Sequence, residues 1–343
     1  MPRRHVKKPG ETVRTAVIGV GYLGKFHAEK YAKIPEVELV GLVDLQRDRA
    51  QEWAKKLGTI AYSDYHDLIG RVDAVSVVVP TDQHFSVARA FLEGGSDVLL
   101  EKPITSTLRE AEDLIATART CRRILQVGHL ERFNPALVAV RERIRAPLFF
   151  EVHRLTPFRQ RGVEVDVVLD LMIHDLDIIL SIVRSEAKAI QAVGVPVLTG
   201  NVDIANARLE FAGGCVANLT ASRVSLEDRR RIRVFQPESF VMVDFAAKKA
   251  NFFKRIVNAD SGGIKIETEP VRVDPGDALE NEIRSFVRCS QRRTRPPVTG
   301  EEGKRALALA LQIKEEIQKN LEKIPAIQSF YERTDEDLRD HSW

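Results

Sequence analysis

The chain has 343 residues, 44% of them hydrophobic and 29% charged, and its formal net charge is +3. This length predicts two domains with ample core, and so small a charge gives no sign of a nucleic-acid partner. No apolar run reaches the ~18 residues that a membrane span requires, so we expect no membrane partner. Cys121, Cys215 and Cys289 form neither a zinc-type pair nor an even disulfide set, which fits a reducing cytoplasm best.

Residues 13–25 read as a short buried strand, a glycine turn and the start of a helix near Tyr22. Gly19, Gly21 and Gly24 have the G-x-G-x-x-G spacing of dinucleotide-binding turns. In such a turn the first glycine permits the tight bend, the second lets a pyrophosphate approach the backbone, and the third lets the helix pack on the strand. The N-terminal end of the helix then points its free N–H groups at the phosphates.

A second apolar run, residues 37–43, ends at Asp44. This acid follows Gly24 at the distance of about 20 residues where a ribose-binding carboxylate is expected. A carboxylate there accepts hydrogen bonds from the ribose hydroxyls and repels a 2′-phosphate, which favours NAD over NADP. Arg47 is close enough to keep NADP open. The alternative for the whole pattern is a glycine turn that merely packs a helix against a strand.

The chain alternates strands and helices up to about residue 145. After the second strand we expect helices at 46–57, 64–69, 83–93 and 107–120, the last with a Thr107–Glu110 capping box, and strands at 73–79, 97–100 and 123–127. Such units form a Rossmann fold, a doubly wound parallel sheet, which binds ligands at the carboxyl ends of its strands. We therefore assign residues 13–146 to an NAD-binding domain and expect binding residues in the loops 81–84, 101–103 and 128–135.

The pattern changes after Pro147. We expect a strand at 148–155, one long helix at 166–184, successive strands at 187–267, and two helices at 277–289 and 301–321. This order predicts an α+β domain with a mostly antiparallel open sheet, for substrate binding and oligomerisation, over residues 147–330. Residues 1–12 are expected to form a flexible N-terminal arm and residues 331–343 a polar C-terminal tail.

Glu101-Lys102-Pro103 ends a strand on the expected cofactor side. Pro103 restricts the backbone of Lys102 and so helps to fix its side chain. An ammonium there can hydrogen-bond a substrate hydroxyl and stabilise a developing oxyanion. The alternative is an exposed lysine whose charge is solvated at the end of a strand.

In the helix expected at 166–184, Asp166, Asp170 and His174 recur every four residues and Asp177 continues the same stripe. Oxidation of an alcohol requires a base for the hydroxyl proton, and histidine titrates in the right range, with Asp170 placed to orient it. A structural histidine and a metal site are the alternatives. No further ligand set with metal spacing is present, so no metal is predicted.

Several basic side chains could bind an anion. Arg132, in the loop 128–135, could hold a phosphate or carboxylate, or cap the helix that starts near Asn134. Arg154, Arg159 and Arg161 lie between a strand and the His174 helix, well placed to grip an anionic substrate. The basic groups 229–231 and 292–295 are expected to be solvated faces or dimer contacts rather than phosphate sites.

Together these motifs resemble the Gfo/Idh/MocA oxidoreductase family over residues 14–323. The matching stretches are 19–24, 80–84, 101–103, the Asp170-x-x-x-His174-x-x-Asp177 helix, and 295–303. The resemblance implies NAD(P)-linked oxidation of a sugar or cyclitol hydroxyl by a homodimer or homotetramer. It implies a catalytic trio of Lys102, Asp170 and His174, with Thr81 and His84 near the cofactor.

Within that family, residues 128–136 and 151–154 look most like a nucleotide-sugar branch that oxidises C3 of a UDP-N-acetylglucosamine-type sugar. The arginines would suit a diphosphate. A dehydrogenase of inositol or a free hexose is the first alternative, and a non-catalytic dinucleotide-sensing regulator is the second. The predicted cofactor-binding residues are Gly19, Gly21, Tyr22, Leu23, Gly24, Asp44, Arg47, Pro80, Thr81, His84, Glu101 and Lys102. The predicted substrate-binding residues are His129, Arg132, Phe133, Asn134, Arg154, Arg159, Arg161 and Asp177.

Overall fold

The computed structural model describes residues 11–160, 162–258 and 263–324. Arg161, the tail predicted at 331–343 and all but the last two residues of the predicted arm therefore lie outside the described residues. The chain forms two compact units, one running to Phe133 and including Gly276–Arg305, the other comprising Asn134–Pro275 and the chain from Ala306 onward. Residues 276–305 thus belong to the first unit, although the sequence placed them in the second domain.

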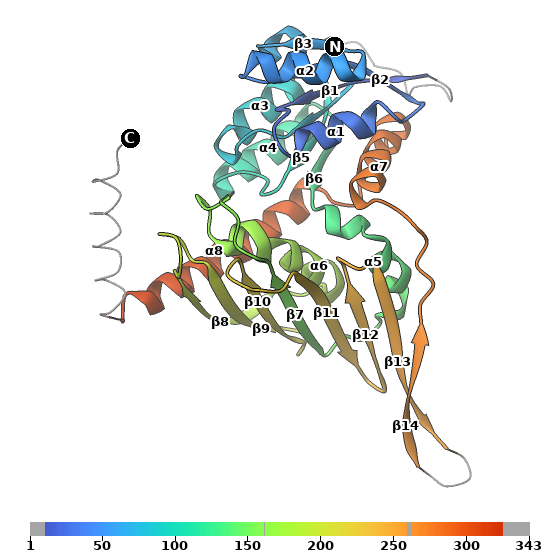
Figure 1. The fold of residues 1–343 in the computed structure, drawn as a ribbon, viewed down its shortest axis with the longest axis vertical. Coiled ribbons are helices and arrows are strands. Elements are labelled where there is room, and N and C mark those ends of the chain that lie inside the picture. Colours follow the sequence, from blue (N-terminus) through green and yellow to red (C-terminus); the bar gives the residue numbers. More distant parts are fainter. Residues whose placement is uncertain (1–10, 161, 259–262, 325–343) are drawn as a thin grey trace. The chain divides into compact units, whose positions relative to one another are not determined.

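The first unit contains a six-stranded sheet in which every neighbouring pair is parallel. Its strands, in spatial order, are β3 (Ile60–Tyr62), β2 (Val37–Val43), β1 (Val13–Ile18), β4 (Ala74–Val77), β5 (Asp97–Glu101) and β6 (Leu125–Gly128) (Figure 1). This is the Rossmann order, in which the chain switches direction between β1 and β4 and opens a binding crevice there. The predicted doubly wound parallel sheet is therefore confirmed.

Helices flank this sheet. They are α1 (Gly24–Tyr31), α2 (Arg47–Leu57), α3 (Thr81–Glu93), α4 (Leu108–Thr120) and α7 (Ala278–Arg292). The predicted capping box of α4 is present, with Thr107 and Glu110 each bonded to the other's backbone. Helix α7 joins this unit because Ile283, Phe286 and Val287, at helical spacing, are buried in the same core cluster as residues of α1 and α2.

The second unit contains an eight-stranded open sheet. Its strands, in spatial order, are β14 (Ile264–Pro270), β13 (Lys249–Val257), β12 (Ser239–Asp244), β11 (Arg229–Gln236), β7 (Phe149–Leu155), β10 (Val216–Ser222), β9 (Ile204–Phe211) and β8 (Ala187–Val195). All neighbours are antiparallel except β7 and β10, which are parallel. The expected mostly antiparallel sheet is confirmed.

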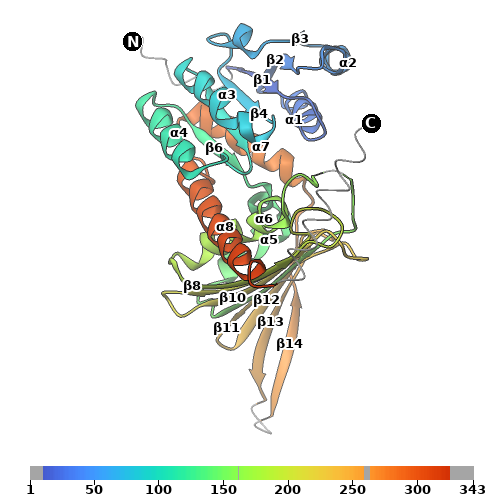
Figure 2. The ribbon, with the colours of Figure 1, turned by 90° about the vertical axis from the view of Figure 1, so that its left-hand side faces the viewer.

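One face of this sheet is covered by α5 (Pro135–Val140), α6 (Ile173–Val183) and the part of α8 (Gly300–Leu321) that follows Arg305 (Figure 2). Alternating strand residues such as Phe150 and Val152 point into this helix-covered core. Short 3-10 turns occur at Tyr65–Leu68, Leu130–Phe133 and Arg141–Arg143. Among the described residues, no helix has both the length and the apolar character required to cross a membrane.

The single helix predicted over 166–184 is divided in the structure. A π-helical turn, Val168–Met172, runs directly into α6, which ends at Val183 because Arg184 adopts a left-handed φ of 51°. Asp170 lies in the π-helical turn and His174 in the first turn of α6. Single π-helical turns inside helices are frequent at functional sites.

Candidate active site

The three glycines of the turn after β1 are required for different reasons. Gly19 has φ +87°, and a Cβ there would lie 2.4 Å from the carbonyl oxygen of Val78; a Cβ on Gly24 would lie 1.8 Å from the carbonyl oxygen of Gly19. Packing of the protein alone therefore excludes side chains at both positions. At Gly21, in contrast, the nearest atom to an added Cβ is Arg49 Nη1, 3.9 Å away. The open space over Gly21 is the room that a dinucleotide pyrophosphate needs.

Helix α1 starts directly after this turn. It begins at Gly24 without a side-chain cap, and Tyr22 and Leu23 before it are exposed. An uncapped N-terminus presents free N–H groups and the positive end of the helix dipole to an anion. The turn and the start of α1 thus fit the phosphates of a dinucleotide.

Asp44 lies at the carboxyl end of β2 and its carboxylate is fixed by the backbone. One oxygen accepts the N–H of Val20 at 3.0 Å and the other accepts the N–H of Gln46 at 2.8 Å. Arg49 Nη1 approaches the same carboxylate at 3.4 Å, whereas Arg47 is exposed at the start of α2. The arginine beside the acid is therefore Arg49, which the sequence reasoning missed. Helical side chains point back toward the N-terminus of their helix, and this rule could have identified it.

The loops that follow β4 and β5 are connected through the side chain of His84. Pro80 precedes α3, Thr81 begins it, and the buried His84 ring lies 3.0 Å from the carbonyl oxygen of Val79 and 2.8 Å from that of Pro103. Burial lowers the pKa of His84, and a neutral ring carries one N–H, so it donates to one of these carbonyls at a time. His84 therefore ties together the two loops that follow β4 and β5.

Glu101, the last residue of β5, is buried and held by a polar chain that starts on α1. His27 Nε2 lies 3.1 Å from Glu101 Oε1, His27 Nδ1 lies 3.1 Å from Ser76 Oγ, and Tyr31 lies 2.9 Å from the same Ser76 oxygen. The distances fit a chain in which Tyr31 donates to Ser76, Ser76 to His27 and His27 to Glu101. Burial opposes ionisation of Glu101, but the hydrogen bond from His27 together with the nearby His27 and Lys102 lowers its pKa.

Lys102 is half-buried directly after β5, and the bond to Pro103 is cis. Its backbone N–H donates to Glu101 Oε2 at 3.2 Å, so the buried carboxylate orients the residue that carries the ammonium. Each of four candidate groups follows a strand of this sheet. The glycine turn follows β1, Asp44 follows β2, the Pro80 loop follows β4, and Lys102 follows β5. Because these strands are parallel neighbours, all four groups lie at one edge of the sheet.

The loop after β6 is occupied by structural contacts. Arg132 is buried, pairs with Glu302 at 2.7 Å and donates to the carbonyl of Pro297 at 3.3 Å. His129 and Phe133 are also buried. Asn134 accepts the N–H of Ala136 at 3.1 Å and so caps α5. These contacts favour a structural role for Arg132 over binding of a ligand phosphate.

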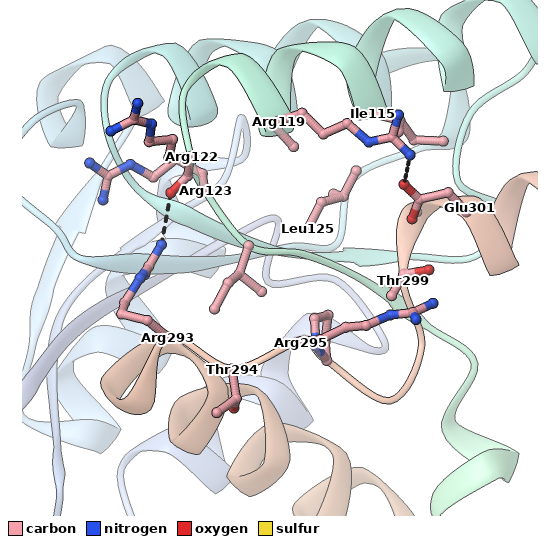
Figure 3. Close-up of a pocket in the computed structure, with 14 residues that line it drawn as sticks. Ile115, Arg119, Arg122, Arg123, Leu125, Arg293, Thr294, Arg295, Thr299 and Glu301 are labelled. Atoms are coloured by element: carbon pink, nitrogen blue, oxygen red, sulfur yellow. Dashed lines mark hydrogen bonds and ion pairs between the residues drawn. The ribbon is translucent and has the colours of Figure 1, made fainter. Parts of the chain in front are cut away.

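The two basic groups differ in their surroundings. Arg229, Arg230 and Arg231 pair with nearby acids. Arg293 and Arg295, in contrast, line a pocket within the first unit (Figure 3). Arg292, Arg293 and Arg295 are all exposed, as expected of a solvated face, and the pocket beside two of them is an addition to that prediction.

In the second unit, the stripe of acids around His174 separates into different environments. Asp166 accepts the N–H groups of Val168 and Leu169, both at 3.0 Å, and pairs with Lys314 at 2.6 Å. It therefore starts the helix and is neutralised. Asp170 and His174 are half-buried, whereas Asp177 is buried.

Arg154 is held inside the second unit. Strand alternation places it with Phe150 and Val152 on the helix-covered face of β7, where it is 3% exposed. Its Nε and Nη2 donate to the two carboxylate oxygens of Asp175 on α6, both at 2.8 Å. A two-pronged pair of this kind fixes Arg154 as a structural cation. Arg159 is exposed, and Arg161 lies outside the described residues.

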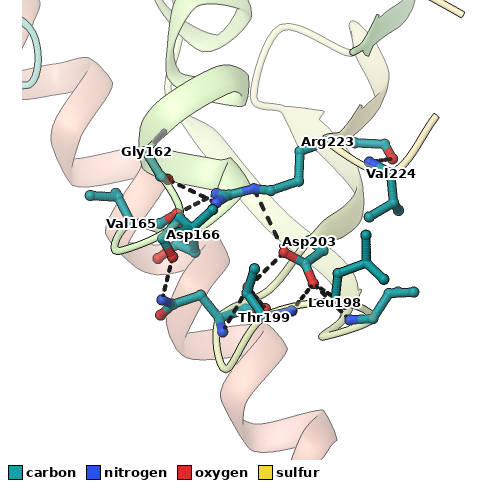
Figure 4. Close-up of polar contacts among 12 residues, drawn as sticks. Gly162, Val165, Asp166, Leu198, Thr199, Asp203, Arg223 and Val224 are labelled. Atoms are coloured by element: carbon teal, nitrogen blue, oxygen red, sulfur yellow. Dashed lines mark hydrogen bonds and ion pairs between the residues drawn. The ribbon is translucent and has the colours of Figure 1, made fainter. Parts of the chain in front are cut away.

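The segment before Asp170 is anchored by a buried pair that the sequence reasoning missed (Figure 4). Arg223 donates to the carbonyls of Gly162, at 2.8 Å, and Val165, and its Nε lies 3.7 Å from Asp203 Oδ1. Burial opposes ionisation of Asp203, but three backbone N–H groups and a threonine hydroxyl lower its pKa. Gly162 in turn lies against Asp170, since a Cβ there would be 3.5 Å from Asp170 Oδ2.

Comparison with known proteins identifies the family. A sequence model of an oxidoreductase family with an NAD-binding Rossmann fold matches residues 13–129, and one of the GFO/IDH/MocA C-terminal domain matches residues 142–238. The chain belongs to the Gfo/Idh/MocA oxidoreductase family. Two of its relatives in this family are named as dehydrogenases, and like them it is an oxidoreductase acting on CH–OH groups.

Two Gfo/Idh/MocA relatives illustrate the range of substrates. UDP-N-acetylglucosamine 3-dehydrogenase from Acidithiobacillus ferrooxidans is 38% identical over 91% of this chain and 99% of its own length. Its solved structure has a TM-score of 0.85 and covers 90% of this chain and 98% of that chain. Myo-inositol 2-dehydrogenase from Thermotoga maritima is 28% identical over 89% of this chain and 96% of its own length.

Proposed function

We propose that this protein is an NAD-dependent dehydrogenase that oxidises the C3 hydroxyl of a UDP-N-acetylglucosamine-type nucleotide sugar to a ketone. The observation that carries the proposal is the 38% identity, over almost the full length of both chains, to a UDP-N-acetylglucosamine 3-dehydrogenase. The inositol dehydrogenase that covers a similar share of the chain is 28% identical. The open space over Gly21 and the fixed carboxylate of Asp44 support the dinucleotide part.

For the cofactor, we assign the pyrophosphate to Gly21 and the start of α1, and the adenosine ribose to Asp44. When bound, the nicotinamide would supply the hydride acceptor. Asp44 disfavours a 2′-phosphate, and Arg49 offsets part of that repulsion, so we propose NAD with weaker binding of NADP.

For the reaction, we assign the catalytic trio to Lys102, Asp170 and His174. His174 takes the proton of the substrate hydroxyl, and Asp170 orients the ring. Lys102 hydrogen-bonds the same oxygen and stabilises its negative charge until the carbonyl has formed. Asp166 takes no part, because capping and Lys314 already satisfy its carboxylate.

For the substrate diphosphate, we favour Arg159 and Arg161 over Arg132 and Arg154. The guanidiniums of Arg132 and Arg154 are buried in ion pairs with Glu302 and Asp175. Separating either pair would leave an uncompensated charge in the interior. Arg159 is exposed before the His174 helix and adjoins Arg161 within one short segment of sequence.

We also propose a homodimer or homotetramer. In the described part of the second unit, four phenylalanines from adjacent strands gather on the sheet face opposite the helices. Their ring centroids lie 5.8, 5.2 and 4.1 Å apart in succession, and the residues are Phe149, Phe235, Phe240 and Phe253. A half-exposed aromatic row of this kind is suited to a subunit interface. Sedimentation of the full chain tests this, and a monomer at micromolar concentration would contradict it.

The function is tested by NADH formation with UDP-N-acetylglucosamine, other UDP-sugars, free hexoses and myo-inositol. Lys102→Ala and His174→Ala should each lower turnover by about 10²- to 10⁴-fold and leave NAD binding nearly unchanged. His66→Ala, at an exposed histidine in the 3-10 turn Tyr65–Leu68, is the matched control and should retain turnover. Near-normal turnover of either trio variant would refute that residue's role.

An inositol or hexose dehydrogenase is the second candidate, favoured by the relative from Thermotoga maritima. The two functions differ in whether arginines hold a diphosphate. Added salt should raise the KM of a UDP-sugar and barely change that of inositol. Turnover confined to inositol, with a KM insensitive to salt, would replace the first proposal by the second.

A further inference from the structure

A pocket of about 510 Å³ lies within the first unit, away from the residues assigned to the cofactor (Figure 3). It is formed by the end of α4, the start of β6 and the segment that links α7 to α8. Ile115 and Ala118 of α4, Leu125 of β6 and Pro296 give it an apolar lining. Its volume is in the range of about 300–1,000 Å³ that is typical of small-molecule sites.

Five arginines surround this apolar lining, namely Arg119, Arg122, Arg123, Arg293 and Arg295. Two of them are paired with acids: Arg119 with Glu301 at 2.5 Å, and Arg293 with Asp97. The lining of the pocket thus carries more guanidiniums than these two carboxylates pair. Within the residues that the structure describes, the side chains of Arg122 and Arg295 make no ion pair, and both are exposed.

The shape and charge together indicate the ligand class. Guanidinium groups bind phosphates in a two-pronged manner and stack on planar rings. An apolar lining beside the exposed guanidiniums of Arg122 and Arg295 therefore suits a flat organic body that carries more than one phosphate. We propose that this arginine-lined pocket is a second nucleotide site, which takes a nucleoside diphosphate, either free or esterified to a sugar.

The pocket is separate from the expected NAD site. Leu125 is the first residue of β6, so the pocket lies at the amino end of that strand. Gly21, Asp44 and Lys102 follow carboxyl ends of the same parallel sheet, which is the opposite edge. A nucleotide bound at the pocket would therefore not compete with NAD.

The segments that form the pocket are already connected to one another. Arg293 Nη2 donates to the carbonyl of Arg122 at 2.9 Å, and Arg119 reaches Glu301 in the first turn of α8. A diphosphate held by Arg122 and Arg295 would add a second connection between the end of α4 and the α7–α8 link. Binding there should therefore raise the thermal stability of the protein by mass action.

The test is calorimetric titration of the full chain with ADP, UDP and UDP-N-acetylglucosamine in saturating NADH, which fills the expected cofactor site without accepting hydride from the sugar. The Arg122→Ala/Arg295→Ala variant removes two guanidiniums that hold no acid. Its matched control is Arg109→Ala/Arg292→Ala, which removes two exposed arginines that do not line the pocket. At least one of the three nucleotides should bind wild type and control equally, and bind the pocket variant about tenfold more weakly or worse.

The pattern of ligands identifies the source. Loss of ADP and UDP binding in the pocket variant indicates a free diphosphate, whereas loss confined to UDP-N-acetylglucosamine indicates a sugar nucleotide. The proposal would be overturned if the pocket variant and the control bound every nucleotide equally. It would also be overturned if inorganic pyrophosphate bound as tightly as the nucleotides, because the apolar lining would then contribute nothing. These titrations involve no sugar oxidation, so their failure would leave the proposed dehydrogenase activity unaffected, and the converse also holds.

Discussion

Gly21→Ala separates the role of the glycine turn in folding from its role in binding. The nearest atom to the added Cβ is 3.9 Å away, which is ordinary van der Waals contact. Unlike Gly19, Gly21 does not have a positive φ, so alanine fits its backbone. The free energy of unfolding without ligand should therefore stay the same or rise by about 0.4–1 kcal/mol, because alanine restricts the unfolded chain.

Binding of NAD should respond in the opposite way. The new methyl group would occupy the space through which the pyrophosphate approaches the backbone, and would weaken charge-assisted hydrogen bonds worth about 1.5–3 kcal/mol each. The Kd for NAD should rise about 10- to 100-fold. Thermal denaturation without NAD and calorimetric titration with NAD measure the two effects in the same preparation.

Gly24→Ala is the matched control. Its Cβ would lie 1.8 Å from the carbonyl oxygen of Gly19, so this variant should lose both stability and NAD binding. A folded Gly21→Ala protein that binds NAD with the wild-type Kd would refute the assignment of the pyrophosphate to this turn. If the Gly21→Ala variant failed to fold, the conclusion that the space over Gly21 can hold a methyl group would be wrong.

Further variants test the buried pairs. Arg154→Met should lower the free energy of unfolding by about 3–5 kcal/mol in urea titrations, because it leaves Asp175 buried without its partner; a raised KM at unchanged stability would instead indicate a substrate contact. Glu101→Gln should remove part of the acid sensitivity of wild type. The folded-state pKa of Glu101 is lowered from 4.5, so the carboxylate stabilises the fold above that pH and loses this effect as the pH falls through the folded pKa. Denaturation from pH 7 to 3 should show the stability advantage of wild type shrinking below about pH 4.5, and a constant difference would contradict it. Arg49→Ala should raise the preference for NAD over NADP, measured as the ratio of the two Kd values, by up to about fivefold. The variant removes the guanidinium that offsets the repulsion between Asp44 and a 2′-phosphate, and a half-exposed ion pair has an effect of this size.

Much of the first unit could be predicted because its signals are local. The apolar runs that become β1 and β2, the glycine spacing and the Thr107–Glu110 capping box each depend on residues close in sequence. The return of α7 to that unit could not be predicted. Its burial depends on contacts with helices that lie far from it along the chain.

The environment of the candidate site residues was harder to predict. Arg132 pairs with Glu302, 170 residues away along the chain, and Arg154 with Asp175 across the core of the second unit. A sequence pattern identifies an arginine but not the acid that folding brings to it. The prediction that Asp166, Asp170 and His174 share one face assumed a regular α-helix. The π-helical turn at Val168–Met172 lies between Asp166 and His174 and changes the angle between their side chains.

The most direct measurement is identification of the product that the full chain forms from UDP-N-acetylglucosamine and NAD. NMR spectroscopy should find the sugar oxidised to a ketone at C3, in an amount equal to the NADH formed. Both products should be lost in Lys102→Ala and His174→Ala, while NAD still binds to each variant. Oxidation at another carbon, or NADH formation from myo-inositol but not from the nucleotide sugar, would contradict the proposed function.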